Sequence, residues 1–421
     1  MRRAAALPLV LALLAGCERA PEPVPAPVAE FIVAAADSVF WIRSEADGIR
    51  VRGAPMVLAQ VGGRFSEIYA ADDDYSFYDA VFIGQRLFKR DLISGDSVQL
   101  VADTLMPLLA RAYAAANPDE RPLEADEHGT EDPRTVATAD LLVLDVHGPW
   151  LSFEYRTDVD VIGGTSAHGA RRGVIDLRTA SPAPLDAIIG AAPARRAIAA
   201  ARDRWTAMHD SLVLAADSAV APVPTADRYA FDPRSFSLAV LDRALQVRFA
   251  VTQANAEEEA TVLELDPAPV EPPAWFEALR GEYPIDERIE ERTWPRDAFT
   301  LVGRPADAPR ARVALALRGR DGTEWRLGSV PAPVLRVMWL EDSTEAPGTR
   351  AALTKAFNEA SFYSGENRIV RHEPRGPIPG AALRPAVRPA ARLHPAAVTP
   401  RRLPPAAPRR AAPTHRSRSG T

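Results

Sequence analysis

The sequence predicts an α+β fold, with mainly antiparallel β-sheet and a few packed helices between disordered termini. Short runs of alternating apolar and polar residues are separated by glycine-containing turn signals, which is typical of antiparallel hairpins. A few other segments repeat their apolar residues at the helical period. The 39 prolines among 421 residues gather towards the two ends, where they oppose regular structure.

The N-terminus has the pattern of an export signal. Arg2 and Arg3 precede an apolar run over residues 4–15, which is shorter than the ~20 residues needed to span a bilayer. The run ends in Leu-Ala-Gly-Cys, which resembles the lipobox of bacterial lipoprotein precursors. The resemblance implies cleavage between Gly16 and Cys17 and attachment of diacylglycerol to the Cys17 thiol. An ordinary signal peptide with an incidental cysteine is the alternative.

The same resemblance implies a place in the cell. A lipidated Cys17 would hold the mature chain on membrane lipid, and the Pro/Ala-rich residues 19–29 would form an extended spacer. Glu18 is not the aspartate that retains such lipoproteins at the inner membrane. We therefore expect a lipid-anchored protein of the cell envelope, at the outer membrane and facing the periplasm.

The charge of the chain argues against nucleic-acid binding. The net charge is −6, but Arg2, Arg3 and residues 371–421 together carry +12, so residues 17–370 carry −18. A surface this acidic repels phosphate backbones. We therefore expect no nucleic-acid partner.

Residues 31–101 are predicted to form a meander of short antiparallel strands. The turn signals are Asp47-Gly48, Gly62-Gly63 and Gly84-Gln85. Residues 103–116 follow as a helix, which Pro107 starts. The predicted core residues of the meander are Phe40, Ile42, Leu58, Phe65, Ile68, Phe82, Leu87 and Leu92.

Residues 138–190 hold the most informative pattern. An apolar run ends in a turn at residues 147–149 (HGP), and a second alternating strand begins at Trp150. A glycine-rich loop at residues 163–169 (GGTSAHG) precedes a further strand and the start of a short helix. In the strand, alternation places Trp150, Ser152 and Glu154 on one face and Leu151, Phe153 and Tyr155 on the other.

Over about residues 138–280 this pattern resembles the α+β domain of unknown function found in a lysozyme-sensing anti-sigma factor and in a peptidoglycan deacetylase. That family has a Gly-Gly-Ala-His loop, into which this chain inserts Thr165-Ser166, and a glycine where this chain has Ala180. A hairpin expected over residues 235–252 and a short helix over 275–279 extend the similarity. The resemblance implies recognition of a cell-wall fragment or of a lysozyme-like protein.

Two further helices and a hairpin complete the prediction. The helix over residues 194–209 presents Ile198, Ala201, Trp205 and Met208 on one face, and the helix over 347–362 presents Leu353, Ala356, Phe357 and Ala360. Strands flank Asp321-Gly322. The chain then divides into a signal peptide (1–16), a lipidated Cys with a Pro/Ala spacer (17–30), a β-meander region with one helix (31–135), an α+β envelope-sensor-like domain (136–282), a β-hairpin plus C-terminal helix region (283–370) and a disordered basic tail (371–421).

The tail contains 11 proline, 11 alanine and 11 arginine residues, a composition that cannot bury a core. One interpretation is a basic arm that adheres to anionic envelope surfaces. The other is a gene-model artefact, since shifted reading frames in GC-rich DNA encode these residues.

No pattern in the sequence predicts a catalytic residue, a metal site or a cofactor. Ser166 and His168, with Asp158 and Asp160 nearby, lack the spacing of a nucleophile elbow. The same histidine and acids, taken with His147, lack the ligand spacing of a zinc site. Because glycines permit backbone shapes that a packed strand does not need, the loop is the predicted partner-binding site, with Gly163, Gly164, Ser166 and His168 as its contacts.

These observations favour a non-catalytic binding or sensing module for a cell-wall fragment or an envelope protein. The expected partners, beyond membrane lipid at Cys17, are a peptidoglycan fragment or a lysozyme-like protein. An envelope hydrolase acting on glycan or peptide is the alternative. Acids or histidines that converge in a cleft would favour the hydrolase.

Cys17→Ala should leave an unprocessed precursor without diacylglycerol, because Cys17 is the single cysteine and hence the single thiol of the chain. Mass spectrometry of the membrane fraction measures this directly. A processed wild-type protein that carries no lipid at Cys17 would contradict the prediction.

Overall fold

The structure, a computed structural model, describes residues 25–35, 38–124, 127, 129–130, 133–161, 166–217, 229–253, 262–285, 291–306, 312–331, 335–340, 346–364 and 367–370. These residues belong to one compact unit. The expected signal peptide, Gly16 and Cys17, residues 17–24 of the spacer and the tail from residue 371 lie outside the described residues.

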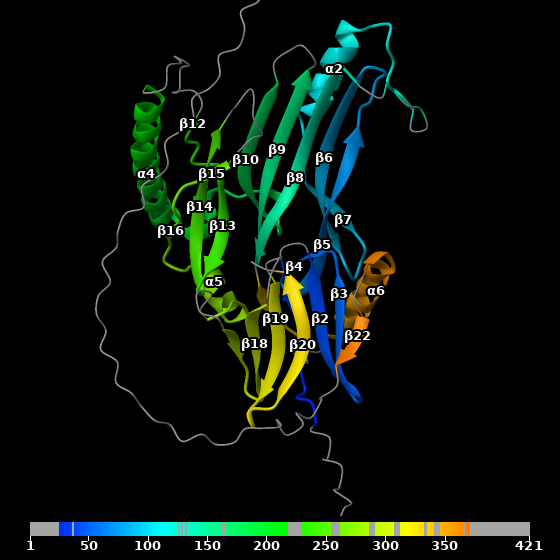
Figure 1. Ribbon diagram of the computed structural model, residues 1–421, viewed down its shortest axis with the longest axis vertical. Helices are drawn as coiled ribbons and strands as arrows, with labels where there is room; N and C mark the ends of the chain where they lie inside the picture. The colour runs from blue at the N-terminus through cyan, green and yellow to red at the C-terminus, as the bar shows by residue number, and fades with distance from the viewer. Residues whose placement is uncertain are drawn as a thin grey trace, which may run out of the picture. The chain divides into compact units, whose positions relative to one another are not determined.

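The largest sheet has eight strands in the order β11-β10-β9-β8-β6-β5-β4, with β7 paired to β6 (Figure 1). All of its pairings are antiparallel except that of β6 with β8. The strands are β4 (Val57–Val61), β5 (Arg64–Asp74), β6 (Ala80–Asp91), β7 (Ser97–Ala102), β8 (Thr135–His147), β9 (Trp150–Val161), β10 (Ala167–Asp176) and β11 (Ser181–Pro182).

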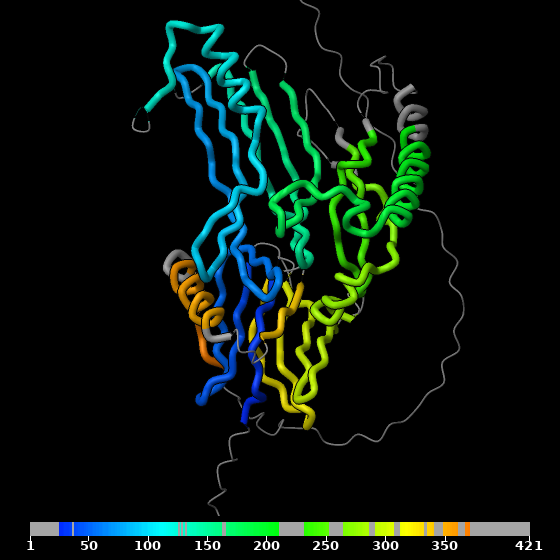
Figure 2. The backbone as a smooth tube through the Cα atoms, turned by 180° about the vertical axis from the view of Figure 1, so that it is seen from behind, coloured from blue at the N-terminus to red at the C-terminus, as the bar shows by residue number. Residues whose placement is uncertain are grey.

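The first and last described strands share a second sheet, in the order β21-β1-β2-β3-β22. Figure 2 shows the C-terminal segment, in orange, beside the blue N-terminal strands. The strands are β1 (Glu30–Ala34), β2 (Val39–Glu45), β3 (Gly48–Ala54), β21 (Arg336–Trp339) and β22 (Asn367–Val370). All four pairings are antiparallel.

Two smaller antiparallel sheets follow. One is built around the hairpin of β13 (Phe236–Leu241) and β14 (Ala244–Gln253), to which β12 (Tyr229–Ala230), β15 (Val262–Glu264) and β16 (Ala268–Pro269) pair. The other is a four-stranded meander of β17 (Arg292–Pro295), β18 (Phe299–Ala306), β19 (Arg312–Gly319) and β20 (Glu324–Pro331). The predicted α+β class with mainly antiparallel sheet is confirmed.

The described helices are α2 (Met106–Ala116), α3 (Leu185–Ile189), α4 (Ala191–Asp217), α5 (Ala274–Leu279), the short 3₁₀ helix η2 (Arg280–Glu282) and α6 (Ala346–Ser364). The predicted helices over 103–116, 275–279 and 347–362 are thus confirmed with small shifts at their ends, and the helix predicted over 194–209 is confirmed but extends eight residues further, to Asp217. None of the helices in the described part of the chain has the length and apolar character needed to cross a membrane.

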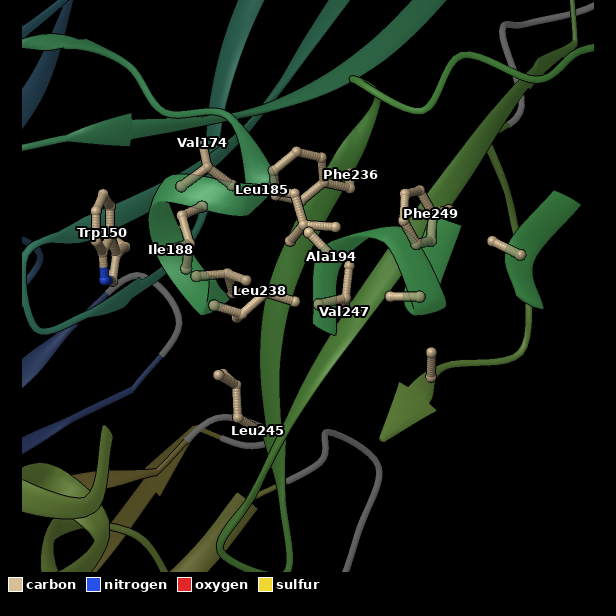
Figure 3. Packing of buried hydrophobic residues seen from close by; sticks show 14 of the residues in the cluster. Trp150, Val174, Leu185, Ile188, Ala194, Phe236, Leu238, Leu245, Val247 and Phe249 are labelled. Carbon is tan, nitrogen blue, oxygen red and sulfur yellow. The ribbon is translucent and has the colours of Figure 1, made fainter. Parts of the chain in front are cut away.

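The largest buried cluster lies where β13, β14, α3 and α4 meet the large sheet (Figure 3). Trp150 and Val174 come from the large sheet, and Leu238, Val247 and Phe249 come from the hairpin. The predicted face of α4 packs here, since Ala201 is buried and Ile198, Trp205 and Met208 contact the cluster. The predicted alternation of β9 is also confirmed, because Trp150 joins this cluster while Leu151, Phe153 and Tyr155 join another one.

The expected segment boundaries do not coincide with the ends of sheets. The large sheet continues from β6 into β8, across the boundary at 135/136. Strands β21 and β22, from segment 283–370, pair with β1 and β3, from segment 31–135. The segments therefore describe stretches of sequence and not separate sheets.

The predicted hairpin turns at Asp47-Gly48, Gly62-Gly63 and Asp321-Gly322 are confirmed. The turn predicted at Gly84-Gln85 is wrong, because Gly84 lies inside β6, opposite Asp73. A Cβ at Gly84 would lie 2.6 Å from Asp103 Oδ2. Gly84 therefore makes room for Asp103, whose carboxylate accepts hydrogen bonds from the first N–H groups of α2.

Ala180, in the turn between β10 and β11, has φ of +52°. This left-handed conformation costs a residue with a Cβ roughly 1–2 kcal/mol, whereas glycine adopts it freely. The resemblance expected from the sequence over residues 138–280 predicts glycine at this position. The turn therefore has the backbone geometry of a glycine turn with an alanine in it.

Ala180→Gly should raise the free energy of unfolding by about 0.5–1 kcal/mol, because relief of the strained φ exceeds the added entropy of the unfolded chain. Urea titration measures the change. The control is Ala112→Gly in the exposed middle of α2, which should lower the free energy of unfolding by about 1 kcal/mol. A loss of stability in both variants would show that Ala180 is not strained.

Candidate functional site

Of the predicted partner-binding residues, Ser166 and His168 are described, whereas Gly163 and Gly164 lie outside the described residues. His168 of β10 faces Asp158 of β9, and its Nδ1 lies 2.8 Å from Asp158 Oδ1. The structure therefore brings His168 to a carboxylate on the neighbouring strand. The partner-binding role of this loop stays a prediction.

A polar cleft of about 220 Å³ lies between the end of β8, strand β10 and the β13–β14 hairpin. Titratable side chains from distant parts of the chain converge in it. The polar residues that line it are Asp145, His147, Arg172, Ser237, Arg248, Glu264 and Tyr283. We take this polar cleft as the candidate functional site.

One wall of the polar cleft is a row of three side chains, Asp145, His147 and Tyr283. Asp145 and His147 are two positions apart at the end of β8 and so lie on one face. His147 Nδ1 lies 2.6 Å from the Tyr283 hydroxyl oxygen. His147 Nε2 lies 2.9 Å from Asp145 Oδ2, without the alignment of a hydrogen bond. His147 is fully buried and Tyr283 nearly so.

The surroundings of this row fix two of its protonation states. Burial acts to raise the pKa of Asp145, but attraction to His147 and then to Arg336 outweighs burial, and the pKa lies below its usual value. Burial raises the pKa of the Tyr283 hydroxyl far above its ordinary range. Tyr283 therefore keeps its hydroxyl proton, and its oxygen lies within hydrogen-bond distance of His147 Nδ1.

Arg336 of β21 adjoins the row and is almost completely buried. Its Nη1 donates to the Val146 carbonyl oxygen at 2.5 Å, and its Nε lies 3.6 Å from Glu282 Oε2. Burial raises the pKa of Glu282, and the opposing attraction of Arg336 and His147 does not offset this. Ionic groups from three separate segments thus meet in a poorly hydrated place.

Two arginines and a glutamate form the opposite wall. Arg172 Nε lies 2.9 Å from Glu154 Oε2, and Arg172 Nη1 lies 2.6 Å from Glu264 Oε1. Arg248 Nη1 lies 3.6 Å from Glu264 Oε2. The buried Nε of Arg248 has no hydrogen-bond partner within the described residues. Arg172 is held by two carboxylates, whereas Arg248 retains a free donor next to the 41% exposed Glu264.

A larger pocket of about 500 Å³ lies beside α3 and α4. Its lining is mostly apolar and includes Val174, Leu185 and Phe236, which Figure 3 labels, with Arg195 and Arg234 as its cations. It offers apolar volume but no cluster of titratable groups like that of the polar cleft. Its chemistry is therefore less specific.

The sequence interpretation missed the polar cleft. Asp145 and His147 carry one local signal, because their spacing of two within a strand puts both on one face. Tyr283, Arg248 and Arg336 carry none, because their pairing depends on how distant strands meet. Where the structure describes the chain, no three acid, histidine or cysteine side chains are placed to hold a metal ion.

Comparison of the chain with protein-family models, with curated proteins and with solved structures gives no match.

Glu282→Gln should change how stability depends on pH. Because the folded-state pKa of Glu282 is raised, the folded chain holds this proton above pH 4.5, where the unfolded chain releases it. The contribution of Glu282 to the free energy of unfolding is complete below pH 4.5 and is lost as the pH rises through the folded pKa. In urea titrations, the free energy of unfolding of the wild type should exceed that of Glu282→Gln by a margin that grows as the pH falls from 7 to 4.5.

Glu324→Gln is the control of opposite sign. Hydrogen bonding from Arg304 lowers the pKa of Glu324 to about 2, so its contribution is present above pH 4.5 and is lost as the pH falls towards 2. The difference in free energy of unfolding between wild type and Glu324→Gln should therefore shrink as the pH falls from 4.5 towards 2. The same pH dependence in both variants would contradict the assignment of Glu282 as a buried acid.

Proposed function

We propose that this chain is a lipid-anchored binding protein of the bacterial cell envelope, whose polar cleft holds a carboxylate-bearing fragment of the cell wall. The observation that carries the proposal is Arg248, which lines the cleft and has a buried Nε without a partner in the part of the chain that the structure describes. Leaving such a donor unpaired costs about 1–3 kcal/mol. A bound carboxylate that reached this donor would recover this cost.

The other groups of the polar cleft fit such a ligand. Arg172 is already paired with Glu154 and Glu264, so it fixes the shape of the wall. Ser237 and Tyr283 add hydroxyl groups, which suit amide and sugar groups. At about 220 Å³ the cleft takes one end of a muramyl peptide, because drug-sized ligands need roughly 300 Å³ or more.

The envelope location rests on the lipobox-like residues 14–17 and on the resemblance over residues 138–280. The left-handed backbone of Ala180, where the family has glycine, supports that resemblance. A placement at the outer membrane, facing the periplasm, follows from Glu18. A lysozyme-like protein, the second partner that the resemblance implies, would be contacted through the loop at 163–169.

An envelope hydrolase is the alternative, and the order Asp145, His147, Tyr283 favours it, because it resembles a proton relay. The protonation of Tyr283 opposes it. A hydroxyl nucleophile must give up its proton to an adjacent base, and burial makes Tyr283 harder to deprotonate. Binding is therefore the function that the geometry supports best.

Calorimetric titration of the full lipidated protein in detergent with N-acetylmuramyl dipeptide tests the proposal. We expect saturable binding that Arg248→Met weakens about tenfold or more, since a charged hydrogen bond is worth ~1.5–3 kcal/mol. The amidated, uncharged dipeptide should bind the wild type as weakly as the acid form binds the variant.

The matched control is Arg326→Met, which removes an exposed arginine of β20 that does not line the polar cleft. Its affinity should equal that of the wild type. Equal affinity of wild type and Arg248→Met would overturn the cleft as the binding site. If the wild type releases products from labelled cell wall and His147→Gln does not, this would favour the hydrolase function instead.

A further inference from the structure

A second charged cavity lies between α6 and the sheet of β21, β1, β2, β3 and β22. Its volume is about 330 Å³, and it shares no residue with the polar cleft. We call it the arginine pocket. Its lining residues are Trp41, Arg43, Glu45, Arg50, Arg52, Thr354 and Asn367.

The strand register brings three arginines together in the arginine pocket. Arg43 of β2 is directly opposite Arg50 of β3, and Arg52 is opposite Trp41 on one side and Asn367 of β22 on the other. Side chains two positions apart share a face of the sheet. Like charges placed directly opposite each other are destabilising, so this arrangement calls for a compensating anion.

Among the lining residues, Glu45 is the one side chain that supplies a negative charge. Glu45 Oε1 lies 2.7 Å from Arg43 Nη2 and 2.8 Å from Arg50 Nε, and these hydrogen bonds lower the pKa of Glu45 to about 2. One carboxylate is thus shared between two guanidinium groups. The seven lining residues carry three positive charges and one negative charge.

Arg52 is the arginine without a carboxylate. Its hydrogen-bond partner in the described structure is the neutral amide oxygen of Asn358. Burial, and then repulsion by Arg50 and Arg43, lower the pKa of Arg52. Attraction to Glu45 offsets these effects only in part, so within the described residues the positive charge of Arg52 is incompletely compensated.

Trp41 forms part of the wall of the arginine pocket. The side chain is 3% exposed, and its buried Nε1 has no hydrogen-bond partner in the described ranges. The ring lies 5.3 Å from the Arg43 guanidinium carbon, which fixes the position of Arg43. A buried indole N–H normally finds an acceptor.

We propose that the arginine pocket binds a phosphate group, either as the free ion or as a phosphate monoester on a small organic molecule. A phosphate would supply the missing negative charge and would accept hydrogen bonds from Arg52. The volume lies at the lower end of the range for organic ligands, which leaves room for the esterified group. This site is independent of the function proposed for the polar cleft.

Titration of the full protein with glucose 1-phosphate, inorganic phosphate and glucose, at constant ionic strength, tests the inference. Glucose 1-phosphate should bind saturably and glucose should not. Equal affinity for both phosphates would assign the site to the free ion, and tighter binding of glucose 1-phosphate would assign it to the ester. A protein that binds neither phosphate would overturn the inference without the use of any variant.

Arg52→Gln should weaken phosphate binding about tenfold or more. Arg52→Lys, which keeps the charge, should lose less. Arg326→Gln is the matched control and should bind like the wild type. Arg248→Met should also leave phosphate binding unchanged, which separates this test from that of the polar cleft. Equal affinity of wild type and Arg52→Gln would overturn the inference.

Discussion

The buried guanidinium of Arg336 is the constraint on which the arrangement of the sheets depends. It belongs to β21, in the sheet with β1, β2, β3 and β22. It donates to the carbonyl oxygens of Val146 on β8 and Leu58 on β4 of the large sheet. Its Nε lies 3.6 Å from Glu282, next to Tyr283. Removing one partner of a buried ion pair costs roughly 3–5 kcal/mol, so Arg336 disfavours arrangements in which these segments do not meet.

The same constraint shapes the polar cleft. Arg336 helps to keep Asp145 ionised, and Asp145 and Tyr283 hold His147 from two sides. The wall opposite Arg248 is therefore fixed before any ligand arrives. Such preorganisation reduces the entropy that binding must overcome. The opposite wall is less constrained, because Glu264 is 41% exposed and Arg248 has a donor without a partner among the described residues.

Local patterns predicted much of the fold and little of the candidate site. The helix faces of α4 and α6, the alternation of β9 and three of the glycine turns follow from neighbours along the chain, and the structure confirms them. Gly84 was misread because a glycine that makes room for Asp103 has the same local signature as a turn. The parallel pairing of β6 with β8 has no local signature at all.

The site was harder to predict for the same reason. His147, Tyr283 and Arg336 come from three segments, and only the pairing of distant strands brings them together. The sequence favours the glycine loop with His168 as the binding site because its glycines and histidine lie close together along the chain. A buried cluster of this kind leaves single, widely spaced residues in the sequence, each with an ordinary structural explanation.

Histidine NMR of the full protein, with and without N-acetylmuramyl dipeptide, tests the central claim most directly. His147 lines the polar cleft and His168 does not, so the two side chains report on the two competing sites. The account predicts that the dipeptide shifts the imidazole signals of His147 and leaves those of His168 unchanged. A shift confined to His168 would contradict binding in the polar cleft and would favour the glycine loop as the binding site.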